Sequence, residues 1–306
     1  MPELPEVEVV RAGLAPAVTG ARVIAVTVRD ARALTRHAGS AADFEARLTG
    51  RVMSGAARRG KFLWLPLSPV PAADGGMPSS EALVGHLGMS GQLLLRESGA
   101  PVERHERVRL DIAHPVHGEL AVVFCDQRTF GSLALDDVVA TPDGAAGGWG
   151  TDAAAVPSQV AHIARDPLDA AFDEARWRAA LTRKDSAIKR VLLDQTTASG
   201  IGNIYADESL WAARIHPETP ASVLSTRAAH RLLAEVRAVL EKALAEGGTS
   251  FDAQYVNVNG QAGYFAHSLN AYGRTGQPCP RCGRPIHRDA FMNRSSHFCP
   301  VCQRKR

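Results

Sequence analysis

Four cysteines near the C-terminal end constrain this chain more than any other feature. Cys279, Cys282, Cys299 and Cys302 have the spacing C-x2-C-x16-C-x2-C. Two C-x2-C pairs at this separation are typical of a tetrahedral zinc site with each pair on a tight turn. Two disulfides are the alternative, but the first residues are acidic and do not resemble the signal peptide of a secreted chain. We therefore expect one structural Zn²⁺ per chain, because four thiolates leave no open position for water.

The N-terminal run Met-Pro-Glu-Leu-Pro-Glu-Val-Glu favours a second specialised site. A small second residue normally allows removal of the initiator methionine, so Pro2 is expected to become a free secondary amine. An α-amino group titrates roughly 2.5 pH units below lysine. A secondary amine that attacks a sugar C1′ gives an iminium, which is an electron sink for elimination. Glu3 and Glu6 could supply acid–base chemistry. The alternative is structural, with Pro5 opening a helix and Glu6 at its positive end.

Charge is unevenly distributed along the 306 residues, although the net charge is only +3. Residues 271–306 contain eight Lys or Arg and one acidic residue, a net charge of +7, which leaves −4 for the first 270. A basic tail indicates a polyanionic partner, or alternatively a solubilising segment. The hydrophobic content of 45% supports two or three domain cores. Because no run of 18 uncharged apolar residues occurs, we expect no membrane span.

Apolar spacing divides the chain into an α+β, multidomain arrangement. Residues 5–18 have helical spacing, residues 22–137 contain short β-rich runs typical of a sandwich or barrel, and a loop is expected at 71–80. Strands are expected at Val23–Val28, Phe62–Leu67, Leu83–Leu87, Gln92–Leu95, Val108–Ile112 and Leu120–Phe124, and helices at Leu168–Leu181, Ser186–Asp194, Asn203–Arg214 and Thr226–Ala245. The expected divisions are 1–140, a linker or hinge at 141–158, a helical part at 159–248, loops at 249–273 and the cysteine module at 274–306.

A glycine-rich joint between two expected helices could bind an anion. In the run from Gln195 to Tyr205, Gly200 and Gly202 allow close backbone approach, and Asn203 could cap the following helix. Free N–H groups at a helix start attract anions. Lys189 and Arg190 precede the joint, so the segment suits a DNA phosphate. An ordinary capped bend is the alternative.

Three further stretches each allow two interpretations. Lys61 begins a strand and could be solvated or could hold a phosphate. Met89 lies in a glycine-flanked turn, where it could fill a core or enter a base stack. Arg128 and Phe130 lie two residues apart and would share one side if extended, but could also form a plain hairpin. Cys125 lies in an apolar run and is expected to be a buried thiol.

Six motifs in order give the chain a resemblance, over nearly its full length, to the bacterial formamidopyrimidine-DNA glycosylase (Fpg/Nei) family of base-excision repair enzymes. They are Pro-Glu-Leu-Pro-Glu-Val-Glu at 2–8, Arg-Gly-Lys-Phe at 59–62, His-Leu-Gly-Met-Ser-Gly at 86–91, Asp-x-Arg-x-Phe-Gly at 126–131, Gly-Ile-Gly-Asn-Ile-Tyr-Ala at 200–206, and Asn-Arg-Ser-Ser-His-Phe-Cys-Pro-x-Cys-Gln at 293–303. The resemblance implies an N-terminal β-sandwich with a flanking helix, a helix-two-turn-helix domain and a C-terminal zinc-finger β-hairpin.

The resemblance also implies roles for individual residues. Pro2 would be the nucleophile that forms a Schiff base with C1′, and Glu3 the acid that helps to open the sugar ring. The full set of implied roles is catalytic for Pro2, Glu3, Lys61 and Arg294, DNA-binding for Met89, His105, Arg128, Phe130, Lys189 and Asn203, supporting for Glu6 and Glu208, and zinc-binding for Cys279, Cys282, Cys299 and Cys302. Met89, Arg128 and Phe130 would fill the gap left by the flipped nucleotide, while Lys61, Lys189, Asn203 and Arg294 would contact phosphates. The loop around Gly263-Tyr264-Phe265 would cap the flipped base.

The implied activity is that of a bifunctional glycosylase/AP lyase, which excises 8-oxoguanine and formamidopyrimidines from duplex DNA and cleaves the strand by β,δ-elimination. Its partner would be double-stranded DNA with oxidised purines or abasic sites, and the protein would be a monomer in the bacterial cytoplasm, associated with the nucleoid and not with a membrane. An endonuclease VIII-like enzyme for oxidised pyrimidines is the alternative, and a catalytically silent DNA-binding protein is a second. Gln127 and Thr129 depart from the pattern of some family members, which leaves the opposite-base contacts open.

Overall fold

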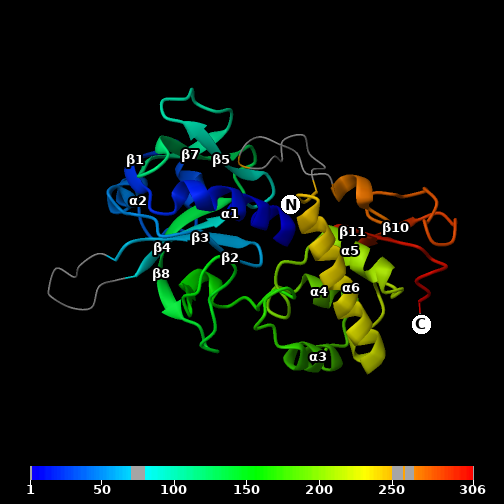
Figure 1. Cartoon of the computed structure of the whole chain (residues 1–306). Coiled ribbons are helices and arrows are strands. Elements are labelled where there is room, and N and C mark those ends of the chain that lie inside the picture. Colours follow the sequence, from blue (N-terminus) through cyan, green and yellow to red (C-terminus); the bar gives the residue numbers. More distant parts are fainter. Residues whose placement is uncertain (1, 70–79, 250–257, 259–264, 306) are drawn as a thin grey trace. The chain divides into compact units, whose positions relative to one another are not determined.

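The protein divides into two compact units. A computed structural model describes residues 2–69, 80–249, 258 and 265–305 (Figure 1). The first unit contains Pro2, Glu6–His162 and Val258, and the second contains Glu3–Pro5, Ile163–Thr249 and residues 265–305. The 71–80 loop (apart from Ser80) and Gly263-Tyr264 lie outside the described residues.

Two antiparallel sheets form the first unit. The four-stranded sheet has the order β1 (Arg22–Val28), β6 (Glu106–His114), β7 (Gly118–Asp126) and β5 (Gly91–Glu97). The five-stranded sheet has the order β2 (Ala57–Arg59), β3 (Phe62–Pro66), β4 (Glu81–His86), β8 (Ser132–Ala140) and β9 (Ala155–Pro157). The expected sandwich architecture is confirmed.

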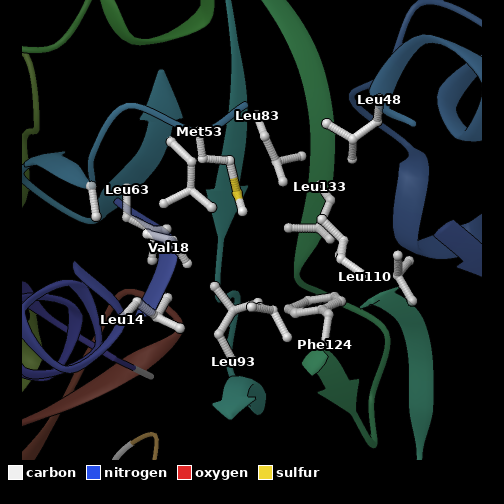
Figure 2. Packing of buried hydrophobic residues seen from close by; sticks show 14 of the residues in the cluster. Leu14, Val18, Leu48, Met53, Leu63, Leu83, Leu93, Leu110, Phe124 and Leu133 are labelled. Atoms are coloured by element: carbon white, nitrogen blue, oxygen red, sulfur yellow. The ribbon is translucent and has the colours of Figure 1, made fainter. Parts of the chain in front are cut away.

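One hydrophobic cluster lies between these sheets and the flanking helix α1 (Leu4–Val18). Figure 2 shows Leu14 and Val18 of α1 with Leu63, Leu83 and Leu133 of one sheet and Leu93, Leu110 and Phe124 of the other, all at most 4% exposed. The period-two alternation of these strands turns their apolar side chains toward this layer. Burying each large apolar side chain contributes roughly 1.5–3 kcal/mol, so the core fixes the turns at the sheet ends.

Several elements of the first unit were absent from the sequence expectations. Helix α2 (Ala41–Leu48) begins at Ser40, whose side chain accepts a hydrogen bond from the Asp43 backbone N–H. Strand β8 was missed because Asp136 and Asp137 interrupt its apolar residues and part of its second half is exposed. The short 3₁₀ helices are η1 (Ala31–Leu34) and η2 (Ser158–Val160).

The segment expected as a linker, 141–158, packs within the first unit. Strand β9 pairs with β8, and the backbone of Trp149 exchanges two hydrogen bonds of 2.9 Å with that of Arg58. Glycine makes this approach possible, because a Cβ at Gly148 would lie 2.2 Å from the Arg58 carbonyl oxygen. The change from one unit to the other comes later, between His162 and Ile163.

The second unit is helical and ends in a β-hairpin. Its elements are α3 (Glu174–Thr182), α4 (Ile188–Leu193), α5 (Asn203–Ala212), η3 (Ala221–Val223), α6 (Thr226–Ala245), η4 (Phe265–Ser268), β10 (His287–Phe291) and β11 (Arg294–Phe298). Helix α6 has the predicted bounds because its signals are local: Ser225 caps its start, and Gly247 follows its end at a φ of 75°. Helix α3 begins at Glu174, six residues later than expected, and Asp173 is its N-cap residue. Within the described part of the chain, no helix combines the length and apolarity that a membrane crossing needs.

Candidate active site and zinc centre

Helix α5 of the second unit begins against the carboxylate of Glu3. The backbone N–H of Gly202 donates to Glu3 Oε2 at 2.6 Å and that of Ile204 donates to Oε1 at 2.9 Å, with Tyr205 N–H at 3.4 Å from Oε2. Glu3 is 2% exposed. A helix N-terminus attracts anions because its first N–H groups have no partner within the helix. The anion at this joint is therefore the chain's own carboxylate, which corrects the expectation of a DNA phosphate there.

Two glycines make room for the N-terminal segment. Gly200 has a φ of +91°, its carbonyl accepts from the Leu4 N–H at 3.0 Å, and a Cβ on it would lie 2.7 Å from Leu4 Cδ1. A Cβ on Gly202 would lie 2.3 Å from Glu3 Cδ. Gln195 supports the loop by accepting from the Gly200 N–H and donating to the carbonyl of Ile201, each at 2.9 Å. Gln195 was not expected from the sequence to have a role of its own, although it begins the glycine-rich run.

Asn203 occupies the first turn of α5 but does not cap it. The N-cap residue is Gly202, which has no side chain that could accept a capping hydrogen bond. The Asn203 side-chain amide donates instead to the carbonyl of Ser295 in β11, at 3.1 Å. Asn203 remains partly exposed, so a phosphate contact from it stays a prediction.

Glu208, later on α5, anchors another segment of the second unit. Its carboxylate accepts hydrogen bonds from the backbone N–H groups of Asn270, Ala271 and Tyr272 at 2.8–2.9 Å, and from the Asn270 amide at 3.2 Å. Burial raises the pKa of Glu208, and these four donors act in the opposite direction. This geometry gives Glu208 an ordering role for residues 270–272. Its expected support of the Pro2 amine remains a prediction.

In the first unit, Pro2, Glu6 and Lys61 are all buried. Lys61 is only 8% exposed, so it is not an ordinary solvated lysine. Nearby, His86 accepts from the Gly88 N–H at 3.2 Å. Burial lowers the pKa of His86 to about 4, with further lowering by the charges of Arg36 and Lys61. A neutral imidazole and a buried ammonium therefore lie where β3 begins and β4 ends, within the five-stranded sheet.

Met89, Arg128 and Phe130 occupy adjacent turns of the first unit. Met89 is 43% and Phe130 is 56% exposed, and the Arg128 guanidinium lies 4.9 Å from the centroid of the Phe130 ring. Ser90 Oγ donates to Asp126 Oδ1 at 2.6 Å and also accepts from the Arg128 N–H at 3.2 Å, which joins the two turns. The sequence therefore brings an exposed Met, Arg and Phe together.

Asp126 orders this group, a role that was not expected from the sequence. Besides Ser90, its carboxylate accepts from the backbone N–H groups of Arg128 at 3.1 Å and Gly131 at 2.7 Å. Its own N–H donates to the carbonyl of His105, which has a φ of 63° and is partly exposed. The first position of the Asp-x-Arg-x-Phe-Gly motif was the available signal, because short aspartate side chains commonly organise turns.

Lys189 is not placed to contact a phosphate, which corrects the sequence expectation. It is 0% exposed, and its Nζ lies 2.7 Å from Asp207 Oδ1 while donating to the Ser295 carbonyl at 2.8 Å. Its neighbour Arg190 is exposed and lines a groove of about 790 Å³ together with Arg294 and residues of the hairpin turn. Arg190 and Arg294 are therefore the arginines that this groove offers to an anion.

The four cysteine sulfurs form the predicted metal site. All four Sγ atoms lie within 4.8 Å of one another. The donor set matches zinc, which prefers four thiolates in a closed structural site. Trp211 of α5 donates its indole N–H to Cys279 Sγ at 3.4 Å, and the Arg281 guanidinium lies 4.0 Å from the centroid of the Trp211 ring. The site holds one structural Zn²⁺, and Trp211 is a supporting residue that the spacing alone did not indicate.

The remaining cysteine behaves as expected. Cys125 lies on β7 and is 6% exposed. Burial raises the pKa of its thiol to about 12. It is therefore an inert thiol rather than a metal ligand or nucleophile.

Comparison with known proteins gives matches along the whole chain. Three family models match in order: the formamidopyrimidine-DNA glycosylase N-terminal domain at residues 1–133, the formamidopyrimidine-DNA glycosylase H2TH domain at 163–254, and the zinc finger found in FPG and IleRS at 276–304. A formamidopyrimidine-DNA glycosylase of Leifsonia xyli subsp. xyli is 63% identical over 304 residues, covering 99% of this chain and 100% of the relative.

Solved structures agree in fold. The Lactococcus lactis Fpg in complex with DNA containing an abasic site has a TM-score of 0.80 and 30% identity, and a mutant of that protein with DNA containing Fapy-dG has a TM-score of 0.81 and 32% identity. Both matches cover 99% of this chain and 100% of the other.

Proposed function

Because the chain belongs to the formamidopyrimidine-DNA glycosylase family, we propose that it excises oxidised purines from duplex DNA and then cleaves the strand at the resulting abasic site. The observation that carries this proposal is the 63% identity, over 99% of the chain, to a relative of that name. The residues that the activity needs are present: Pro2 as amine, Glu3 beside it in the chain, and the exposed Met89, Arg128 and Phe130.

In the proposed reaction, Pro2 is the nucleophile. Its nitrogen forms a bond to C1′, the glycosidic bond breaks, and the base leaves with a proton. The Glu3 carboxylate takes the proton that the Pro2 nitrogen releases and passes it to the ring oxygen as the sugar opens, which gives the iminium. The hydrogen bonds from Gly202 and Ile204 fix the Glu3 carboxylate in one orientation. Loss of a proton from C2′ then expels the 3′ phosphate, a second elimination with loss of the C4′ proton expels the 5′ phosphate, and hydrolysis of the iminium restores Pro2.

A base inside duplex DNA must leave the stack before C1′ can be attacked. We propose that Met89, Arg128 and Phe130 fill the resulting gap. Their exposure and the stacking of Arg128 on Phe130 support this role, because an apolar wedge replaces lost stacking and a guanidinium offers hydrogen bonds to the unpaired base. His105 lies beside this group through its bond to Asp126 and is proposed as a further DNA contact.

Phosphate contacts are proposed for Lys61, Asn203 and Arg294, with Arg190 in place of Lys189. The exposure of Arg190 and Arg294 in one groove supports this choice. Residues 1–140, together with the packed segment 141–158, would then form the catalytic domain, 159–248 the helix-two-turn-helix domain and 274–306 the zinc finger. Much of the expected lesion-capping region, 249–273, lies outside the described residues. Within a bacterial cell, the protein would be associated with the nucleoid.

Borohydride trapping tests the proposal. Reduction of the iminium during reaction with an 8-oxoguanine duplex should link the protein to DNA, and peptide mapping should place the adduct on Pro2. An undamaged duplex is the control and should give no adduct. An adduct on Lys61, or trapping on thymine glycol duplexes with none on 8-oxoguanine, would overturn the proposed nucleophile or the proposed substrate respectively.

A variant that retains Met1 separates chemistry from binding. With the initiator methionine in place, Pro2 is part of a peptide bond and has no free amine. The variant should therefore give no adduct, while its affinity for lesion DNA stays within a few fold of that of the mature protein. Adduct formation by the variant would show that another amine is the nucleophile.

A further inference from the structure

A buried charged group connects helices α4 and α5 of the second unit with the zinc-finger hairpin. Asp207 of α5 is 0% exposed. Its Oδ2 accepts from the backbone N–H of His297 at 2.8 Å and lies 3.2 Å from His297 Nδ1. Its Oδ1 lies 2.7 Å from Nζ of Lys189, which is also 0% exposed. An aspartate, a lysine and a histidine thus form one buried network.

The same network holds the backbone next to Arg294. Lys189 donates to the carbonyl of Ser295 at 2.8 Å and to Ser296 Oγ at 3.0 Å. Its Nζ also lies 5.2 Å from the centroid of the Phe291 ring, and Phe291 is the strand partner of Arg294 in the hairpin. Lys189 of α4 therefore holds Phe291 before the two-residue turn and the backbone of Ser295 just after Arg294, and Asp207 holds the far end of β11.

Apolar side chains would hold a hairpin against two helices at least as strongly as this network does. Buried ion pairs pay a large desolvation cost, and replacing them with apolar residues is often neutral or stabilising. What a hydrogen-bonded ion pair adds is a fixed geometry, because only one register satisfies all of its donors and acceptors. The groove that Arg294 shares with Arg190 is the feature next to this network that needs such a register.

We infer that Asp207 is a positioning residue for Arg294. By holding Lys189 and His297, it fixes β11 so that the Arg294 guanidinium reaches one DNA phosphate. This inference rests on the proposed function, in which Arg294 contacts DNA. It predicts that removal of a negative charge from the second unit weakens DNA binding, whereas simple electrostatics predicts that binding becomes tighter.

The test is the salt dependence of binding to a duplex with a stable abasic-site analogue. Each phosphate contact contributes about 0.9 to the slope of log K against log salt concentration. Arg294→Ala should lower the slope by about 0.9. Asp207→Asn should lower it by a similar amount and weaken binding roughly tenfold at low salt, and the double variant should lose no more slope than Arg294→Ala alone.

A matched control removes the same charge elsewhere in the unit. Glu174→Gln breaks a partly exposed ion pair with Arg237, and its slope should equal that of the unmodified protein. Asp207→Asn leaves the buried Lys189 ammonium without its carboxylate partner. The combined variant Lys189→Met with Asp207→Asn removes this unpaired charge as well. It should keep its zinc and fold but show the same loss of slope.

The possible outcomes distinguish the inference from its premise. If Arg294→Ala leaves the slope unchanged, the phosphate contact is refuted and the inference with it. If Arg294→Ala lowers the slope but neither Asp207 variant does, the contact stands and the positioning role is refuted. A fall in melting temperature with an unchanged slope would identify the network as structural only, and would also refute the inference.

Discussion

Gly202→Ala is expected to displace the Glu3 carboxylate from the start of α5. The backbone at Gly202 has φ −123° and ψ −157°, which alanine adopts readily, so the substitution introduces no backbone strain. The added Cβ would lie 2.3 Å from Glu3 Cδ and 2.4 Å from Oε1, far inside van der Waals contact. Since the Gly202 N–H itself is retained, the effect isolates the position of the carboxylate.

The cost follows from the contacts that are lost. Displacement breaks the two short hydrogen bonds from Gly202 and Ile204, of 2.6 and 2.9 Å. Hydrogen bonds to charged groups contribute about 1.5–3 kcal/mol each. We therefore expect the free energy of unfolding to fall by about 3 kcal/mol or more, measured by urea denaturation. If Glu3 is the general acid, single-turnover excision of 8-oxoguanine should slow by a factor on the order of 100.

Gly55→Ala is the matched control, because a Cβ there meets no atom within 4 Å. Its stability and excision rate should stay close to those of the unmodified protein. The combination with Glu3→Ala tests the physical cause, since removing the carboxylate creates space for the new methyl group. Gly202→Ala should then cost little further stability. An equal cost in both backgrounds would refute the clash with Glu3.

Three further outcomes are expected. Trp211→Phe removes the indole N–H bond to Cys279 while keeping the ring, so zinc should pass to a competing chelator about tenfold faster, and an unchanged transfer rate would show that the bond is dispensable. The unmodified protein should excise the lesion about ten- to hundredfold faster opposite cytosine than opposite adenine, because cytosine presents two acceptors to the Arg128 guanidinium, and Arg128→Ala should lose most of this preference. Single-turnover rates from the two duplexes measure the preference, and its retention in the variant would contradict the prediction. Burial, with the charges of Arg36 and Lys61, keeps the pKa of His86 near 4, so as the pH drops this histidine takes up a proton in the unfolded chain before it does in the folded protein. The free energy of unfolding should therefore fall between about pH 6.5 and about pH 4, by on the order of 3 kcal/mol in all. In His86→Asn, the free energy of unfolding should fall much less over this pH range, as measured by urea titration at each pH. An identical fall in the variant and the unmodified protein would refute the assignment to His86.

Features encoded in short segments were predictable from the sequence. The zinc site depends on cysteine spacing alone, and α6 is defined by its apolar face, the Ser225 cap and Gly247. Helix α2 carried a similar signal, with Ser40 three residues before Asp43, but its eight residues contain only two buried apolar positions and gave little periodicity.

Features that depend on distant residues were not predictable. The anion at the start of α5 comes from Glu3, 199 residues away in the chain. The burial of Lys189 depends on β11, more than 100 residues later, which no helical period reveals. A lysine beside an exposed arginine looks equally suited to phosphate in the sequence. The packing of the hairpin and the ion pair with Asp207 of α5 distinguish Lys189 from Arg190.

The attachments of helix α5 limit which of its residues can be substituted during evolution. Its ten residues, about 15 Å long, hold Glu3 at the start, the hairpin through Asp207, residues 270–272 through Glu208 and the zinc site through Trp211. Each of these attachments occupies a different position on the helix, so few positions are left where a substitution is without effect. A library of single substitutions selected for repair activity should retain the least diversity in α5 and much more on the exposed face of α6. Lineages of this family would then diversify around a nearly invariant helix.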